Sequence, residues 1–409
     1  MTDARTAIEK AAREAYGRLL AFLAVRWRNV AAAEDALADA FVAALEKWLQ
    51  SGVPDKPEAW LYTAARRRLI DGARRDRVQS QAAPMLLKMA DEAQKWASSV
   101  TNFPDERLQM LFICAHPEID PSIRTPLMLQ MVLGIEAARI AAAFIVKPST
   151  MGQRLTRAKA KMRESGIRFE LPGPDEWPER LGAVLEAIYA AYGSGWNDAD
   201  GFDQRKQGMA EEAIYLGKLL LRFMPEEPEV LGLLALMLHC EARREARRLA
   251  SGHYVPLSEQ DVSLWSGTLI EEAEQYLHTA SKAGKMGRFQ LEAAIQSVHA
   301  HRALTGHTAW EEIALLYEGL VRIAPTIGAW VGRAAAIAEA RGAEQGLASL
   351  RELPDESVKD YQPYWALIAH LLRRLRRIEE ARSAYSRAIG LCSDPAVREF
   401  LKRQSEADG

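Results

Sequence analysis

Helical periodicity runs through almost the whole chain and restricts its fold more than any other feature. In nearly every segment the apolar residues recur at the i, i+3, i+4 and i+7 spacing of one helix face. The strict alternation of apolar and polar residues that marks a half-buried strand is scarce. Ala, Leu, Glu and Arg, which favour helices, are abundant. The sequence therefore predicts an all-α fold.

Residues 134–163, GIEAARIAAAFIVKPSTMGQRLTRAKAKMR, have the pattern of two short helices joined by a tight turn. The turn falls at 145–147, and Pro148 suits the first turn of a second helix because its missing N–H costs nothing there. An apolar stripe on this second helix consists of Met151, Leu155, Ala158 and Met162. Its opposite face is polar and basic, with Thr150, Gln153, Arg154, Arg157 and Lys161. The pattern predicts a helix-turn-helix whose second helix reads base edges and neutralises phosphates; the alternative is a solvated basic helix.

Earlier in the chain an acidic helix precedes an arginine-rich one. After a first predicted helix at about 7–26, a second helix at 31–49 carries Glu34, Asp35, Asp39 and Glu46, and its apolar side includes Leu37, Phe41, Leu45 and Trp48. The turn SGVPDKP follows, and then the segment PEAWLYTAARRRLIDGARRDR. Its apolar side begins with Trp60 and Leu61, and its exposed side is expected to hold Arg66, Arg67, Arg68, Arg74, Arg75 and Arg77.

Charge is divided unevenly along the chain. The net charge of −2 combines +7 over residues 1–169 (26 basic, 19 acidic) with −9 over residues 170–409 (27 basic, 36 acidic). Three widely spaced cysteines without a CxxC motif predict neither disulfides nor a cysteine metal site. No secretion signal or run of about 18 apolar residues is present, so a cytoplasmic protein with no membrane span is expected.

The segments AEDALADAFVAALEKW and PEAWLYTAARRRLIDGARR resemble domain two of the extracytoplasmic-function (ECF) group of bacterial RNA polymerase sigma factors. The helix-turn-helix resembles domain four of the same proteins. The resemblance implies domain two at 1–77, a linker at 78–102 and domain four at 103–169. It implies core RNA polymerase and promoter DNA as partners.

The resemblance also implies three sets of contact residues. The acidic helix would bind a coiled coil of core polymerase through Glu34, Asp35, Leu37, Asp39 and Phe41. The arginine helix would hold the melted −10 element through Trp60, Tyr62, Arg66, Arg67, Arg68, Asp71, Arg74 and Arg75. Aromatic platforms in a cationic groove suit single-stranded DNA, although Trp60 also fits a core position. The −35 element would be read by Ser149, Thr150, Gln153, Arg154, Arg157 and Lys161.

The remaining residues predict a helical repeat domain. The pattern DERL…FICAHP at 105–117 resembles an ECF subgroup that has a large helical C-terminal extension, and within it Cys114 and His116 are interpreted as structural. After the hinge LPGPDEWPER, a tetratricopeptide (TPR) pattern is matched by Trp365, Ala369, Leu372, Ala381, Tyr385 and Ala388. Residues 170–409 are therefore expected to form a TPR-like regulatory or interaction domain that binds a protein partner.

Two functions from different classes fit these patterns. The first is an ECF-type sigma factor that directs promoter-specific initiation, with the extension modulating its activity. The alternative is a stand-alone helix-turn-helix regulator or TPR adaptor that acts without polymerase. No Walker, GxSxG or HExxH motif occurs, so neither an enzyme nor a cofactor is expected. The opposite charges of the two halves predict that the extension docks on the sigma domains.

Overall fold

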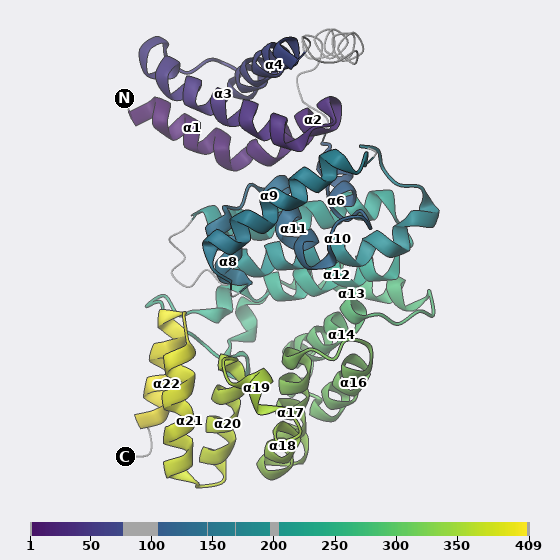
Figure 1. Cartoon of the computed structure of the whole chain (residues 1–409). Helices are drawn as coiled ribbons and strands as arrows, with labels where there is room; N and C mark the ends of the chain where they lie inside the picture. The colour runs from purple at the N-terminus through teal and green to yellow at the C-terminus, as the bar shows by residue number, and fades with distance from the viewer. Residues whose placement is uncertain (1, 77–104, 145, 168, 197–203, 407–409) are drawn as a thin grey trace. The chain divides into compact units, whose positions relative to one another are not determined.

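The structure is a computed structural model that describes residues 2–76, 105–144, 146–167, 169–196 and 204–406 (Figure 1). Every regular element in these ranges is a helix, apart from an isolated antiparallel bridge between Arg248 and Tyr254. The predicted all-α fold is therefore confirmed. The chain divides into two compact units, unit 1 (Met1–Ala191) and unit 2 (Tyr192–Gly409). The predicted linker at 78–102 lies outside the described residues.

Four helices begin unit 1: α1 (Thr2–Glu14), α2 (Tyr16–Trp27), α3 (Val30–Ser51) and α4 (Pro57–Asp76). The single helix expected at 7–26 is in fact two, which meet at the buried Ala15. Helix α3 begins after Asn29, whose side-chain oxygen accepts a hydrogen bond from the Ala32 amide at 3.1 Å and so satisfies a free N–H of the first turn. Leu19, Leu37 and Leu61 are fully buried where α2, α3 and α4 meet.

A second group of unit 1 helices contains the predicted DNA-reading segment. It consists of α6 (Arg107–Cys114), α7 (Pro121–Leu133), α8 (Ala137–Ala143) and α9 (Pro148–Glu164). Asp120 caps α7 by accepting from the Ser122 amide at 2.8 Å. Helix α7 ends at Gly134, which adopts a left-handed conformation (φ 65°) that glycine enters without steric cost. Helix α9 begins with Pro148 in its first turn, as the sequence predicts.

Helix α10 (Trp177–Trp196) crosses the boundary between the two units. Its first turns belong to unit 1, because the buried Arg180 donates to the Phe112 carbonyl oxygen on α6 at 3.4 Å. Trp177 donates to the Pro172 carbonyl oxygen at 3.0 Å and so secures the preceding turn at Pro174–Glu176. The compact part of unit 1 thus continues about 20 residues past the position at which the sequence pattern places the extension.

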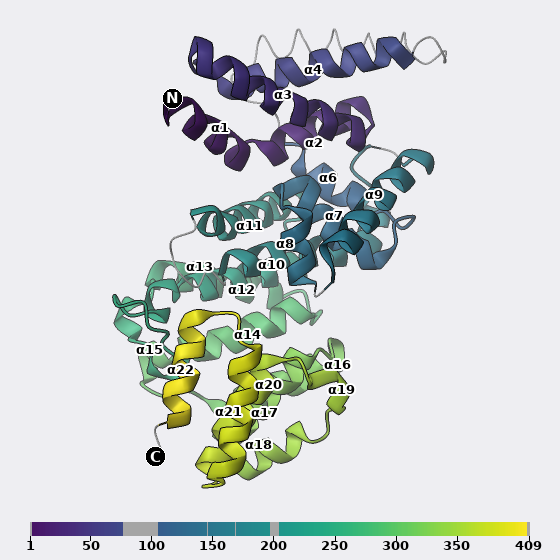
Figure 2. The same cartoon turned by 60° about the vertical axis from the view of Figure 1, so that its left-hand side comes forward.

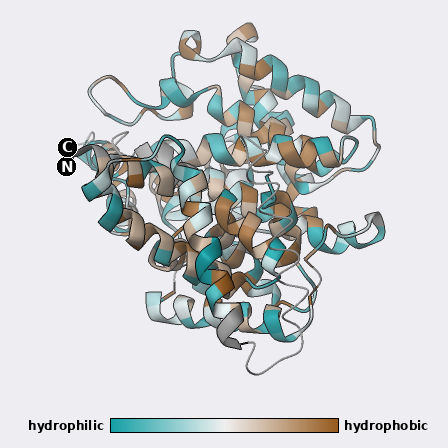
Figure 3. Cartoon of the chain, turned by 90° about the horizontal axis from the view of Figure 1, so that it is seen from above, coloured by the Kyte–Doolittle hydropathy of each residue, from teal (hydrophilic) through white to brown (hydrophobic). Residues whose placement is uncertain are grey.

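Unit 2 is a succession of helices in which neighbours along the chain pack as pairs, among them α16 with α17 and α20 with α21 (Figure 2). The predicted repeat residues Ala369, Leu372, Ala381, Tyr385 and Ala388 are buried in one apolar core, with Trp365 half-buried against it. Individual helices carry both hydrophobic and hydrophilic residues, drawn in brown and teal (Figure 3). After α10 the helices are α11 (Gln204–Phe223), α12 (Pro228–Glu241), α13 (Gly267–Ser281), α14 (Arg288–Ala300), α15 (Arg302–Thr305), α16 (Trp310–Ile323), α17 (Ile327–Arg341), α18 (Ala343–Leu350), α19 (Asp355–Val358), α20 (Gln362–Arg374), α21 (Ile378–Leu391) and α22 (Pro395–Glu406).

Candidate functional site

The outer face of α3 carries the carboxylates expected to bind polymerase. Asp35 and Asp39 are exposed, and Asp39 lies 3.7 Å from the guanidinium of Arg68 on α4. Glu34 is half-buried because its carboxylate pairs with the Lys159 ammonium on α9 at 2.5 Å. Phe41 is half-buried and faces the Tyr16 ring at a centroid separation of 6.2 Å. Leu37 is fully buried, which differs from the expected surface role, because it lies on the side of α3 that packs on the bundle.

Sequence reasoning missed an apolar stripe on the same helix. Val42, Leu45 and Leu49 are 56%, 42% and 39% exposed, and their i, i+3, i+7 spacing places them on one face of α3. The sequence pattern assigned Leu45 to the core side, and the structure corrects this. Large apolar side chains clustered at the surface of a soluble protein commonly mark an interaction site. The exposed part of α3 therefore combines two exposed carboxylates, Asp35 and Asp39, with an apolar stripe.

Helix α4 exposes fewer of its predicted DNA contacts than expected. Arg67, Arg68 and Asp71 are exposed. Tyr62 and Arg66 are only 3% and 9% exposed, because their side of α4 packs into the bundle. Tyr62 meets Phe22 edge-on at 5.5 Å, and burial raises the pKa of its hydroxyl. The side chains of Arg74 and Arg75 lie outside the described part of the structure.

Trp60 is half-buried and meets Trp48 of α3 edge-on, with ring centroids 5.4 Å apart. Its half-buried position lies between the two alternatives that the sequence leaves open, a core residue and an exposed stacking platform. Tyr62 has no accessible ring face for a base. Among the described aromatic side chains expected to contact the −10 element, only Trp60 could therefore serve as a stacking platform.

Helix α9 has the two faces that its sequence predicts. Met151, Leu155, Ala158 and Met162 are all buried. On the opposite side Ser149, Thr150, Gln153, Arg157 and Lys161 are exposed, and Lys161 lies 3.5 Å from Glu118. Arg154 is half-buried and donates to the Ser122 hydroxyl at 2.5 Å, next to the Asp120 cap of α7. Arg157 is thus the most accessible arginine on this face.

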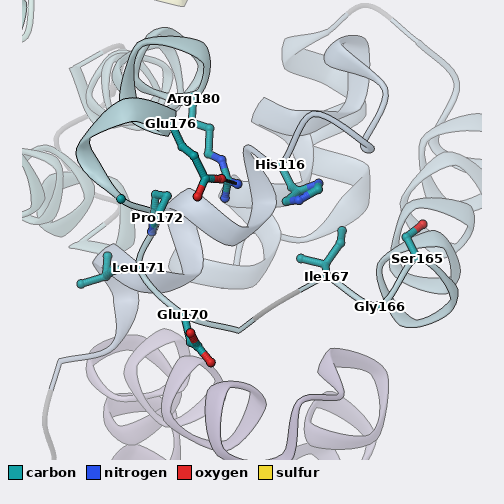
Figure 4. Close-up of a pocket in the computed structure, with 10 residues that line it drawn as sticks. His116, Ser165, Gly166, Ile167, Glu170, Leu171, Pro172, Glu176 and Arg180 are labelled. Carbon is teal, nitrogen blue, oxygen red and sulfur yellow. Dashed lines mark hydrogen bonds and ion pairs between the residues drawn. The ribbon is translucent and has the colours of Figure 1, made fainter.

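A polar cavity of about 500 Å³ lies beside α9, where the end of this helix leads into α10 (Figure 4). His116, Glu176 and Arg180 line it, and Arg180 pairs with Glu176. Burial and the nearby Arg180 lower the pKa of His116, and its Nδ1 accepts from the Glu118 amide at 3.2 Å. Burial raises the pKa of the Cys114 thiol to about 12, which leaves it unreactive. The packing of both residues agrees with a structural role.

The described residues contain no group of three His, Cys, Asp or Glu side chains placed to hold a metal ion. None of the described helices combines the length and the apolar content that crossing a bilayer requires.

Comparison with known proteins adds two family matches and one relative. Residues 13–78, which include α2, α3 and α4, match the family model for sigma-70 region 2. Residues 180–281 match a family of unknown function, DUF6596. The uncharacterized protein R00370 of Rhizobium meliloti (strain 1021) is 36% identical over 402 residues, which cover 97% of this chain and 94% of that protein. No solved structure matches the chain.

Proposed function

This chain belongs to the same protein family as R00370 of Rhizobium meliloti and contains a sigma-70 region 2 domain, and we propose that it is an ECF-type sigma factor that directs core RNA polymerase to specific promoters. Region 2 implies binding to core polymerase and promoter DNA, and sigma-70 proteins are transcription factors rather than enzymes. The observation that carries the proposal is the outer face of α3, which lies within the region 2 match and displays Asp35, Asp39 and the apolar stripe. The alternative of a regulator that acts without polymerase is not favoured, because such a protein has no use for this face.

We assign a separate binding role to each of the helices α3, α4 and α9 according to the side chains that it exposes. The face of α3 binds core polymerase, with the carboxylates steering association and the apolar stripe supplying buried area. Trp60 and the exposed arginines of α4 hold the melted −10 element. Helix α9 reads the −35 element, mainly through Arg157 and Gln153. The TPR-like extension modulates activity through a protein partner or by docking on the sigma domains.

Charge reversal and removal of the apolar stripe on α3 test the proposal directly. Asp35→Lys with Asp39→Lys should weaken binding to purified core polymerase roughly tenfold or more, because opposed like charges at an interface cost several kcal/mol. Val42→Ser with Leu45→Ser should give a loss of similar order. Burial of each of these half-exposed apolar side chains at the interface would contribute about 1 kcal/mol to the binding free energy. Fluorescence anisotropy with labelled full-length protein measures both.

A matched control reverses two exposed carboxylates elsewhere in unit 1, Asp175→Lys with Glu179→Lys. It makes the same change in net charge and should bind polymerase like the parent. If both α3 variants keep their helical circular dichroism and also bind core polymerase as tightly as the parent, the proposed function is wrong.

A further inference from the structure

The polar cavity beside α9 has no part in the proposed function, and all of its lining residues belong to unit 1. Three parts of the chain line it: the turn after α6, residues 165–167 and 170–173 after α9, and the start of α10. Its volume of about 500 Å³ lies within the range of roughly 300–1,000 Å³ that is usual for small-molecule pockets. The cavity therefore has room for a small organic molecule.

Arg180 is the buried charge of this cavity, with only 6% of the residue exposed. Its Nη1 donates to the Phe112 carbonyl oxygen at 3.4 Å, and its Nη2 donates to one oxygen of the Glu176 carboxylate (Figure 4). Its Nε is buried and has no hydrogen-bond acceptor among the described residues. Since Nε and Nη2 lie on the same edge of the planar guanidinium, a single oxyanion could accept from both.

Glu176 is the member of this ion pair that solvent reaches. Its side chain is 50% exposed, whereas that of Arg180 is 7% exposed. Ion pairs with an exposed carboxylate contribute little to stability, because water solvates the free carboxylate well. A bidentate anion can therefore displace Glu176 at a small cost in free energy, and the buried arginine keeps a negative partner throughout the exchange.

Other lining side chains supply further donors. The Ser165 hydroxyl, at the end of α9, is buried and has no partner among the described residues. His116 accepts from the Glu118 amide through Nδ1 at 3.2 Å, so its neutral imidazole carries the proton on Nε2. Burial lowers the pKa of His116, which keeps the imidazole neutral at pH 7. Glu170, the second carboxylate of the lining, is compensated by Arg28 at 3.6 Å.

We propose that this cavity binds a small organic anion, whose phosphate or carboxylate group takes the place of Glu176 on the Nε and Nη2 edge of Arg180. Ser165 and His116 donate to other oxygens of the ligand. In the free protein Glu176 occupies the position of the anionic group and keeps the buried arginine paired. The inference goes beyond the proposed function, because binding of polymerase and promoter assigns no ligand to this cavity.

Isothermal titration calorimetry of the full chain at low chloride concentration tests the site with three probes. Glycerol phosphate supplies a phosphate group, citrate supplies carboxylates, and glycerol is the uncharged match of glycerol phosphate. At least one of the two anions should bind with one molecule per chain, and glycerol should not bind. The anion that binds more tightly shows whether the cavity recognises a phosphate or a carboxylate.

Variants of the ion pair locate the binding. Glu176→Gln removes the competing carboxylate and should tighten binding of the anion about two- to fivefold. Arg180→Lys keeps the positive charge but loses the planar pair of donors, and it should weaken binding about tenfold or more. Glu179→Gln, at an exposed position of α10 outside the cavity lining, makes the same change in charge as Glu176→Gln and should bind like the parent.

A further variant keeps the test independent of folding, because Arg180 also holds α10 on α6. Ser165→Ala removes one hydroxyl and should weaken binding about two- to tenfold. Far-UV circular dichroism and thermal unfolding check the fold of every variant. The inference is overturned if neither anion binds at about 10 mM, or if Glu176→Gln and Ser165→Ala both bind the anion as the parent does.

The outcomes also distinguish this inference from the proposed function, because the titration uses the free chain. A chain that binds an anion in this cavity but does not bind core polymerase refutes only the proposed function. A chain that binds core polymerase but neither anion refutes only the inference drawn here.

Discussion

His239 on α12 is a titratable side chain held inside the core of unit 2, only 2% exposed. Burial, together with Arg243 and His301, lowers the pKa of its imidazole from 6.5 to about 4. The Glu274 carboxylate is 3.4 Å from Nε2 and accepts from Ser297, yet burial remains the dominant influence on His239. The imidazole is therefore neutral in the folded protein at neutral pH.

We predict that unit 2 loses stability as pH falls from about 6.5 to 4. In this range the unfolded chain binds a proton at residue 239 and the folded chain does not, so the free energy of unfolding falls by up to roughly 3 kcal/mol. Urea titration at pH 7.5 and pH 5 measures the difference. His239→Leu should reduce it, whereas His278→Leu, at an exposed position, should not. An equal pH dependence in His239→Leu and the parent would contradict the prediction.

At the scale of single elements, the polar face of α9 carries two basic side chains to which the proposed function gives different roles. Arg157 is exposed on the polar face, where a bidentate contact to a guanine is worth about 1–3 kcal/mol and changes sequence preference. Lys161 is exposed and lies 3.5 Å from Glu118, and in the proposed function it would contact a phosphate, which all sequences share. We predict that Arg157→Ala relaxes sequence preference at the −35 element. Lys161→Ala should instead weaken binding to all promoters alike, and it should reduce the slope of log binding constant against log salt concentration by about 1.

Promoter-specific transcription from a library of randomised −35 sequences measures the first effect, and binding of holoenzyme to one promoter over a range of salt measures the second. Thr156→Ala on α9, an exposed residue whose hydroxyl donates to the Gly152 carbonyl at 2.9 Å, is the control. Unchanged promoter choice in Arg157→Ala would show that α9 does not read the −35 element as proposed.

Elements with one packed side were predictable from the sequence, and elements packed on several sides were not. The apolar stripe of α9 follows from its amphipathic pattern, because this helix has a single buried face. Helix α3 contacts α1, α2, α4 and α9, and the alternation of apolar and polar residues cannot show which side each neighbour covers. The pattern therefore predicts a buried Leu45, which is exposed, and it predicts an exposed Arg66, which is buried. Tyr62, expected to contact DNA, is buried as well.

Long-range contacts in the site were also beyond the sequence. Glu34 and Lys159 are separated by 125 positions, and only the folded chain shows that they pair. The break at Ala15 has no proline, and the nearby Gly17 lies inside α2, so the sequence pattern does not mark where α1 ends. The all-α fold itself was predictable, because helical periodicity needs no knowledge of tertiary neighbours.

At the scale of the whole molecule, the uneven charge should make the dimensions of the protein depend on salt. Residues 1–169 carry +7 and residues 170–409 carry −9. Opposite charges on joined domains attract at low ionic strength, and this attraction is largely screened beyond about 10 Å at 0.1 M salt. If the extension docks on the sigma domains as proposed, the radius of gyration should rise between about 20 mM and 500 mM salt.

Small-angle X-ray scattering of the full chain measures this radius, and far-UV circular dichroism at both salt concentrations checks that the helices persist. A radius independent of salt would show that charge does not hold the extension to the sigma domains.

Helices α2 and α7 cross at Gly17, and this crossing has a consequence for how this chain can diverge in evolution. A Cβ atom at position 17 would lie 1.9 Å from the carbonyl oxygen of Val132, so the backbones of α2 and α7 touch at this point. A relative that keeps this packing should therefore keep glycine at the corresponding position, whereas a relative with any other residue there must shift the two helices apart.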